Sequence, residues 1–162
     1  MREATLRDFF LGLVPAQQLA VEAAASVEEI GRGARRVHVE DMGQSFAITS
    51  PMLVSLCDAV AREDLPPRLL EPIAFAIIAS ENLEWDFDDD VQGRVLYDWS
   101  SPEINWELTT ENVAMFRGWL TGELQPPPVP KLPFDLSNGP VVSHTEKAWV
   151  PPTQSDTQDP EA

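Results

Sequence analysis

Residues 50–80 contain two apolar segments with a proline break between them, and they read SPMLVSLCDAVAREDLPPRLLEPIAFAIIAS. Ser50 followed by Pro51 is typical of a helix start, because serine caps free N–H groups and proline fits the first turn. The first segment then places apolar side chains on one helical face, at Leu53, Leu56, Cys57 and Val60. The sequence DLPP at 64–67 ends this helix. The second segment is apolar almost all round, as expected of a central buried helix, with a kink or a restart at Pro72.

Two shorter helices are predicted before this central pair. The first follows a cap at Thr5 and has an apolar face made of Leu6, Phe9, Phe10 and Leu13. Pro15 suits the first turn of the second helix. Its inward face would consist of Leu19, Ala23, Val27 and Ile30. Gly31 and Gly33 are expected to end it.

Between Arg36 and Thr49 the spacing of apolar residues changes from the helical period to an alternation of every second residue. Apolar and polar side chains alternate over Arg36–Val39 and again over Ser45–Ile48. Met42-Gly43 lies between the two runs and supplies the residues of a turn. The pattern therefore predicts a β-hairpin over residues 36–49.

Two more helices are predicted in the second half of the chain. Val91, Val95 and Trp99 lie at helical spacing and indicate a helix over about 89–98. Thr109 or Thr110 would cap the last helix and Gly122 would end it, with Val113, Phe116, Trp119 and Leu120 inward. Between these helices, alternation of Ile104, Trp106 and Leu108 predicts a short extended piece whose apolar side chains join the core.

The composition changes after Glu123. Nine of the fifteen prolines lie between Pro126 and Pro160, among Ser, Thr, Gln and Asp residues. Such a segment buries too little apolar area to offset its ordering entropy, so residues 125–162 are expected to form a flexible, disordered tail. The fold class predicted for residues 1–124 is mainly α, a single-domain bundle of five to six helices with the short hairpin at 36–49.

The chain is strongly acidic, with 27 acids against 11 bases in 162 residues and a formal net charge of −16. Such a surface repels nucleic-acid phosphates and anionic lipids, so we expect no direct nucleic-acid partner and no membrane. A basic protein is the favoured partner. One cysteine excludes an internal disulfide, and no apolar run reaches the length of a signal peptide or membrane helix. We therefore expect a cytoplasmic protein.

The acids are concentrated between Glu81 and Glu111, where ten carboxylates face a single base, Arg94, and three tryptophans lie among them. Carboxylates at this density repel one another unless a cationic surface meets them, and aromatic side chains often anchor such interfaces. The predicted partner-binding residues are Glu84, Trp85, Asp86, Phe87, Asp88, Asp89, Asp90 and Asp98. The competing interpretation is a solvated acidic face that only maintains solubility.

Metal binding and catalysis are the other functions weighed for these residues. Asp86, Asp88 and Asp90 have the first spacings of an EF-hand loop, but Val91 and Tyr97 occupy its required Gly and Glu positions. No Gly-rich phosphate loop, Cys/His metal cluster or nucleophile elbow is present in the sequence. The sequence thus predicts no metal, no cofactor and no enzyme, although a hydrolase using Asp98 and Glu103 or Glu107 stays an open alternative.

Three stretches resemble small colicin-like bacterial immunity proteins over roughly residues 5–122. LRDFFLGLVPAQQLA at 6–20 and LCDAVAREDLPPRLLEPIAFAI at 56–77 resemble their helical segments. EWDFDDDVQGRVLYDWSSPEIN at 84–105 looks like the acidic, aromatic surface that these proteins present to a toxin. The resemblance implies tight binding to a toxin, often a basic nuclease, and implies no catalytic residue.

Two non-enzymatic functions follow as hypotheses. The first is an immunity-type inhibitor that neutralises a basic partner such as a toxin through the acidic, aromatic surface. The second is an adaptor or assembly subunit of a larger bacterial or phage complex, docking through the proline-rich segment PPPVP at 126–130.

Overall fold

The computed structural model describes residues 1–31, 34–86 and 89–128. Met1–Pro127 forms one compact unit, which contains all the described helices and strands. Most of the predicted tail, residues 129–162, lies outside the described residues, as do Phe87 and Asp88 of the predicted binding surface.

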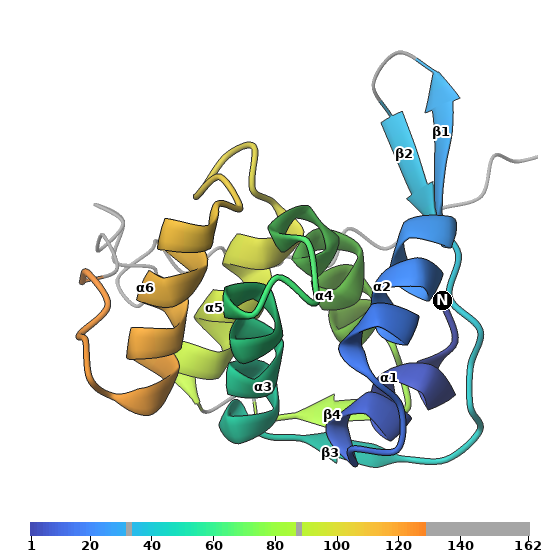
Figure 1. Ribbon diagram of the computed structural model, residues 1–162, viewed down its shortest axis with the longest axis horizontal. Helices are drawn as coiled ribbons and strands as arrows, with labels where there is room; N and C mark the ends of the chain where they lie inside the picture. The colour runs from blue at the N-terminus through green and yellow to red at the C-terminus, as the bar shows by residue number, and fades with distance from the viewer. Residues whose placement is uncertain (32–33, 87–88, 129–162) are drawn as a thin grey trace, which may run out of the picture. The chain divides into compact units, whose positions relative to one another are not determined.

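The expectation of a mainly α protein is confirmed (Figure 1). In chain order the described elements are α1 (Glu3–Phe10), α2 (Ala16–Ala25), β1 (Val27–Gly31), β2 (Ala34–Val37), β3 (Phe46–Ile48), α3 (Ser50–Ala61), the 3-10 helix η1 (Pro67–Leu69), α4 (Leu70–Ala79), β4 (Leu83–Trp85), α5 (Asp90–Ser100) and α6 (Thr110–Thr121).

The core lies where α3 packs on α6 and α4 packs on α5. Trp99 of α5 and Phe116 of α6 are fully buried and meet edge to face, with ring centroids 6.1 Å apart. The predicted stripe of α3 is confirmed, because Leu53, Leu56, Cys57 and Val60 are at most 2% exposed. Pro72 lies in the first turn of α4, where a missing N–H costs no helical hydrogen bond, so the helix restarts from η1 rather than kinks.

The predicted hairpin at 36–49 is wrong. β2 pairs with β1 instead, antiparallel, with Glu28 opposite Arg36 and Glu29 opposite Arg35. Opposite charges that face each other across two strands favour this pairing, in which Val27–Gly31 form a strand instead of the end of the predicted helix. α2 therefore ends at Ala25, and Gly31 enters the turn with φ of 93°.

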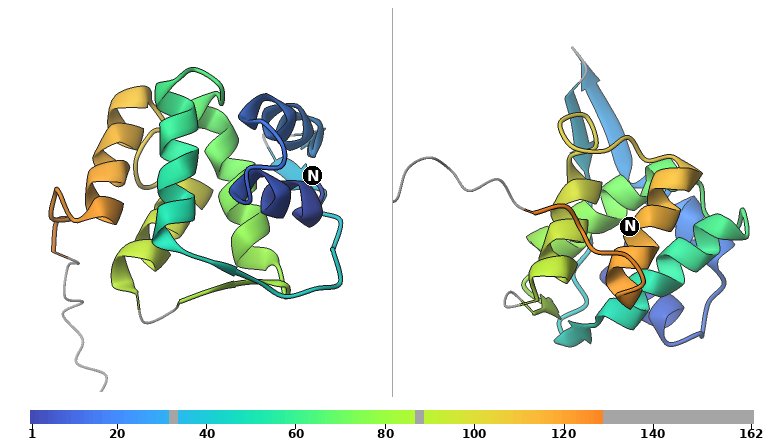
Figure 2. Two further views of the ribbon diagram at one scale, coloured as in Figure 1. Left: turned by 60° about the horizontal axis from the view of Figure 1, so that its bottom comes forward. Right: turned by 90° about the vertical axis from the view of Figure 1, so that its left-hand side faces the viewer.

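The second half of the predicted hairpin forms a different sheet. β3 pairs in parallel with β4, with Phe46 opposite Leu83 and Ile48 opposite Trp85. Figure 2, left, shows these two strands side by side at one end of the helices. Since parallel strands need a long crossover connection, the intervening α3, η1 and α4 bring them together.

The predicted extended piece at 103–108 is also wrong. Residues 102–105 form turns, and the connection from α5 to α6 has no described strand. Ile104 is 77% exposed rather than buried, and Trp106 is 37% exposed with its ring edge-on to Trp119 at 6.4 Å. The last helix is as predicted: the Thr109 hydroxyl accepts from the Asn112 N–H at 3.2 Å, and Gly122 ends α6 with φ of 76°.

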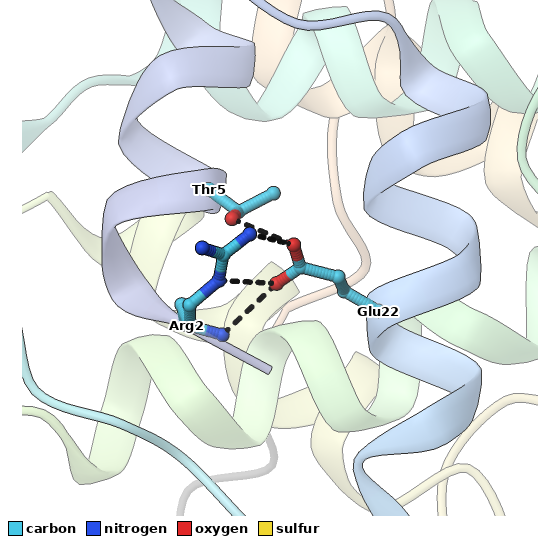
Figure 3. Close-up of polar contacts among 3 residues, drawn as sticks. All are labelled: Arg2, Thr5 and Glu22. Carbon is cyan, nitrogen blue, oxygen red and sulfur yellow. Dashed lines mark hydrogen bonds and ion pairs between the residues drawn. The ribbon is translucent and has the colours of Figure 1, made fainter.

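Two carboxylates attach α1 to the rest of the unit. Glu22 of α2 accepts hydrogen bonds from the Thr5 hydroxyl at 3.0 Å and from the Arg2 backbone N–H and guanidinium (Figure 3). The hydrogen bond from Arg2 is the main reason why the pKa of Glu22 lies below its usual value. Glu3, 1% exposed, accepts from the Met42 N–H, the Asn82 amide and the Ser80 hydroxyl.

No helix within the described ranges combines the length and the apolarity needed to cross a lipid bilayer.

Candidate functional site

The described part of the predicted site surrounds β4 and the start of α5. β4 has the burial pattern of a strand with one covered face: Glu84 points into solvent, while Leu83 and Trp85 on either side of it are buried. Asp86, Asp89 and Asp90 follow within a few residues, so the fold keeps these members of the predicted set close together. Asp98 lies two turns further along α5.

Trp85 belongs to the core rather than to the surface. Its side chain is 9% exposed and meets the Tyr97 ring edge-on, at 6.0 Å between centroids. A Cβ atom added to Gly93 would lie 3.1 Å from the Trp85 ring, so the absence of a side chain at Gly93 lets the indole lie against α5. A partner could therefore reach only the edge of Trp85, and Tyr97, 53% exposed, is the more accessible aromatic ring.

Asp89 has a structural role in this region. Its Oδ1 accepts from the backbone N–H groups of Val91 and Gln92 at 3.1 and 3.0 Å, which caps α5. Its Oδ2 accepts from the Ser50 hydroxyl at 3.1 Å, which joins the starts of α3 and α5. Most of the hydrogen-bonding capacity of Asp89 is therefore used within the fold.

Gln92 is a positioning residue that sequence reasoning missed. It is 1% exposed, donates to the Ile48 carbonyl at 3.1 Å and accepts from the Asp86 N–H at 3.1 Å. One side chain thus joins the ends of β3 and β4 to α5. A glutamine in an acidic, polar stretch gives no sequence signal for burial, because the carbonyl that it donates to, on Ile48, lies 44 residues earlier in the chain.

Asp98 is buried, 8% exposed, in the last turn of α5. Its Oδ2 lies 3.8 Å from Arg94 Nε, beyond hydrogen-bond range, and accepts no hydrogen bond among the described residues. Burial raises the pKa of this carboxyl, and Arg94 opposes the rise only in part. Its buried position gives a partner little access to it.

Asp98→Asn is expected to make the protein more stable at pH 7. Because the folded pKa is raised, ionised Asp98 costs free energy in the folded state, and the neutral amide avoids that cost. The difference in stability between the two proteins should narrow as pH falls through the folded pKa towards the ordinary pKa of an aspartate, because the wild-type group then becomes protonated as well. Urea unfolding of both proteins across this range measures it. A variant that is less stable at pH 7 would mean that attraction to Arg94 outweighs burial.

The acids of the stretch 81–111 fall into two groups at opposite ends of α5. Glu81, Glu84 and Asp90 lie near its start, and Glu103, Glu107 and Glu111 follow its end. An 11-residue helix is about 16 Å long, so the two groups are separated by more than a Debye length at physiological salt. Figure 1 places β4 and the loop from α5 to α6 at opposite ends of the helices.

The group near β4 has no ion pair among the described residues. Ion pairs in the described ranges involve Arg2, Arg7, Arg35, Arg36, Arg62, Arg94 and Arg117. Among the described residues, none of these pairs reaches Glu81, Glu84 or Asp90. Within the described ranges, their mutual repulsion is therefore screened by solvent and dissolved ions rather than by a basic side chain.

A hollow of about 360 Å³ lies beside β4, between the end of α4 and the strand. It is lined by Ile78, Ser80, Glu81, Leu83, Glu84 and Trp85. Its walls thus combine two carboxylates that have no described ion pair with three apolar side chains. This combination suits a cationic side chain with an aliphatic stem, since lysine and arginine bury the stem while the head stays polar. Sequence reasoning singled out Glu84 and Trp85 but not Ile78 or Glu81.

The Cys57 thiol lies in the core. Cys57 is 1% exposed, and burial raises its pKa to about 12, so the thiolate form is rare near neutral pH. Among the described residues, no group of three or more His, Cys, Asp or Glu side chains could hold a metal ion. Asp88, the middle residue of the EF-hand-like spacing, lies outside these ranges.

Comparison with protein-family models, with curated proteins and with solved structures finds no match for this chain.

Proposed function

We propose that this protein is a non-enzymatic binding protein that holds a basic protein through the surface around β4. One observation carries the proposal: the hollow beside β4 combines Glu81 and Glu84, which have no described ion pair, with the apolar side chains of Ile78, Leu83 and Trp85. Exposed carboxylates without ion-pair partners cost the fold little stability, and they attract a cationic surface that approaches them.

The net charge supports the same partner class. A formal charge of −16 attracts a cationic protein over long range and raises the association rate, most strongly at low salt. Short-range affinity would come from the hollow, where basic side chains are partly removed from water. The proposal requires neither a cofactor nor a metal.

The resemblance to colicin-like immunity proteins favours a toxin as the basic partner. Under this proposal the protein is an inhibitor whose carboxylates cover a cationic site, such as one that binds nucleic acid. A nuclease offers that kind of surface, because its substrate contacts are made largely by Lys and Arg.

Affinity capture from the native cell with matched variants tests the proposed function. Glu81→Gln/Glu84→Gln should lose the partner, with affinity falling about tenfold or more. Glu103→Gln/Glu107→Gln removes the same charge at the far end of α5 and should retain the partner. The identified partner should be basic, and its affinity should fall as salt is raised.

Three results of this experiment would contradict the proposal. They are an acidic partner, an affinity that salt does not change, and equal capture by both double variants. Removal of residues 126–162, which takes away the whole PPPVP segment, separates the proposal from the adaptor hypothesis, since a binding surface at β4 should keep its partner after truncation.

A further inference from the structure

The chain turns back on itself where it leaves α6. Gly122 adopts φ of 76°, which reverses the backbone at the end of the helix. The Leu124 N–H then donates to the Gly118 carbonyl at 2.9 Å. A Cβ atom added to Gly118 would lie 2.6 Å from the Leu124 side chain, so the absence of a side chain there lets Leu124 lie against α6. The turn therefore directs the residues that follow it back over the helix.

Arg94 of α5 contacts the start of the proline-rich segment. Its guanidinium donates to the Pro127 carbonyl, and Pro126 just before it is half-buried. The same guanidinium lies over the face of Trp119, 5.1 Å from the ring centroid. Figure 2, right, shows the stretch after α6, in orange, running from the end of that helix towards α5. α5, α6 and the first prolines thus meet at one arginine.

The described contacts of Arg94 with Asp98 and Trp119 leave its N–H groups able to bind a carbonyl. Arg94 is the only base among the ten carboxylates of residues 81–111, yet its Nε lies 3.8 Å from Asp98 Oδ2, too far for a hydrogen bond. Stacking on Trp119, which is 4% exposed, fixes the plane of the guanidinium without using its N–H groups. The Pro127 carbonyl therefore meets donors whose orientation is already set.

The proline run is well suited to being held by such a contact. Proline has no N–H, so carbonyl oxygens are the only hydrogen-bonding groups that the backbone of Pro126 and Pro127 presents. The proline ring also fixes φ at about −65°, so these residues lose less conformational entropy on binding than others do. Proline-rich segments generally bind to aromatic surfaces for this reason. A few contacts at Arg94 therefore suffice to hold the start of the segment.

We propose that Arg94 holds the start of the proline-rich segment in cis, so that any protein that binds PPPVP at 126–130 must first displace this contact. Only a few residues join Pro127 to the end of α6, so the effective concentration of its carbonyl at Arg94 is about millimolar or higher. An outside ligand of PPPVP is weakened by the fraction of chains in which the contact is open. The contact thus regulates the adaptor hypothesis and does not involve the hollow beside β4.

An antibody Fab fragment raised against the synthetic peptide PPPVPKL, residues 126–132, tests this proposal on the full chain. By biolayer interferometry, the Fab should bind the wild-type chain about fivefold more weakly than the free peptide. Arg94→Met keeps an unbranched apolar side chain beside Trp119 but removes the N–H donors, so it should restore most of the lost affinity. Arg94→Lys keeps the charge without the planar guanidinium and should fall between the two.

Arg62→Met is the matched control. It removes the same charge at an arginine that is 59% exposed at the end of α3, and it should leave the affinity of the Fab unchanged. Arg94→Met and Arg62→Met have the same net charge. A difference between them therefore measures the contact with the segment rather than the charge of the chain.

A double-mutant cycle on stability provides a second readout. Arg94→Met should raise the equilibrium constant for unfolding about fivefold more in the full chain than in a chain ending at Gln125, because only the full chain loses the contact with Pro127. The interactions of Arg94 with Trp119 and Asp98 are present in both chains and cancel. The shorter chain retains every described helix and strand. Urea unfolding of the four proteins gives the factor and shows whether each variant is folded.

Four results would overturn the proposal. Equal affinity of the Fab for the free peptide and the wild-type chain would mean that the segment is not held. Weak binding to Arg94→Met as well would mean that another part of the chain covers it. An equal gain in Arg62→Met would assign the effect to net charge. Restored affinity without coupling in the stability cycle would mean that Arg94→Met disturbs the fold instead of opening a contact.

Discussion

Glu3→Ala is expected to lower the free energy of unfolding by about 3 kcal/mol, because three hydrogen-bond donors would lose their acceptor in or near the interior. Glu3 is 1% exposed and accepts from the Met42 N–H at 3.0 Å and the Asn82 amide at 3.1 Å, as well as from the Ser80 hydroxyl. It thereby joins the start of α1 to two distant loops. Urea denaturation followed by tryptophan fluorescence measures the change.

Two control substitutions sharpen the Glu3 experiment. Glu3→Gln keeps the shape and one acceptor oxygen, so its loss should be smaller than that of alanine. Glu107→Ala removes an exposed glutamate and should change stability by less than about 0.5 kcal/mol. If Glu3→Ala behaved like Glu107→Ala, the hydrogen bonds of Glu3 would contribute nothing measurable to stability.

The second large effect is expected at Trp99. Trp99→Ala should cost about 3–5 kcal/mol, because it removes a fully buried indole from the contact between α5 and α6. The Trp99 Nε1 atom has no hydrogen-bond partner among the described residues, so the ring acts through apolar packing alone. Trp99→Phe should therefore cost much less than Trp99→Ala.

Trp106 provides the matched comparison. Its ring is 37% exposed and lies edge-on to Trp119 from a loop. Trp106→Ala should therefore lower the free energy of unfolding much less than Trp99→Ala does. Thermal and urea unfolding of the three variants settle the order. Equal losses for Trp99→Ala and Trp106→Ala would show that the loop from α5 to α6 contributes to the core despite its exposure.

The start of α3 and both ends of α6 could be predicted because their signals are local, whereas the predicted cap of α1 at Thr5 lies inside that helix. Ser50-Pro51 lies at the start of α3, Thr109 caps α6, and Gly122 ends α6 in the left-handed conformation that glycine adopts without strain. Each of these features needs only a few neighbouring residues. A short stretch of sequence therefore suffices to recognise it.

The strands could not be placed from the sequence for two reasons. β1 lies in a segment whose apolar spacing is helical, and β3 pairs with a strand that is distant in the sequence. Val27 and Ile30 continue the apolar spacing of α2, yet Val27–Gly31 pair with Ala34–Val37 as an antiparallel strand, with Glu28 opposite Arg36 and Glu29 opposite Arg35. β3 pairs with residues 37 positions later, a choice that no local alternation can specify.

The candidate site was predictable in position but not in detail. Acid density pointed to the region of Glu84–Asp90, and Glu84 and Asp90 are exposed there. Composition could not separate the exposed acids from Asp98, which is buried, or from Asp89, which caps α5. The exposure of Phe75 on α4, 44%, escaped notice because a helix that is apolar all round predicts complete burial.

The hydrogen bonds of Glu3 also bear on how the chain folds during synthesis. Its acceptor oxygens are satisfied by Ser80 and Asn82, and β3 finds its partner only at residues 83–85. At a translation rate of about 5–20 residues per second, α1 emerges several seconds before these partners exist. α1 can contact α2 early through Glu22, but the hydrogen bonds of Glu3 to Ser80 and Asn82 and the pairing of β3 with β4 form only after residues 80–85 have left the ribosome.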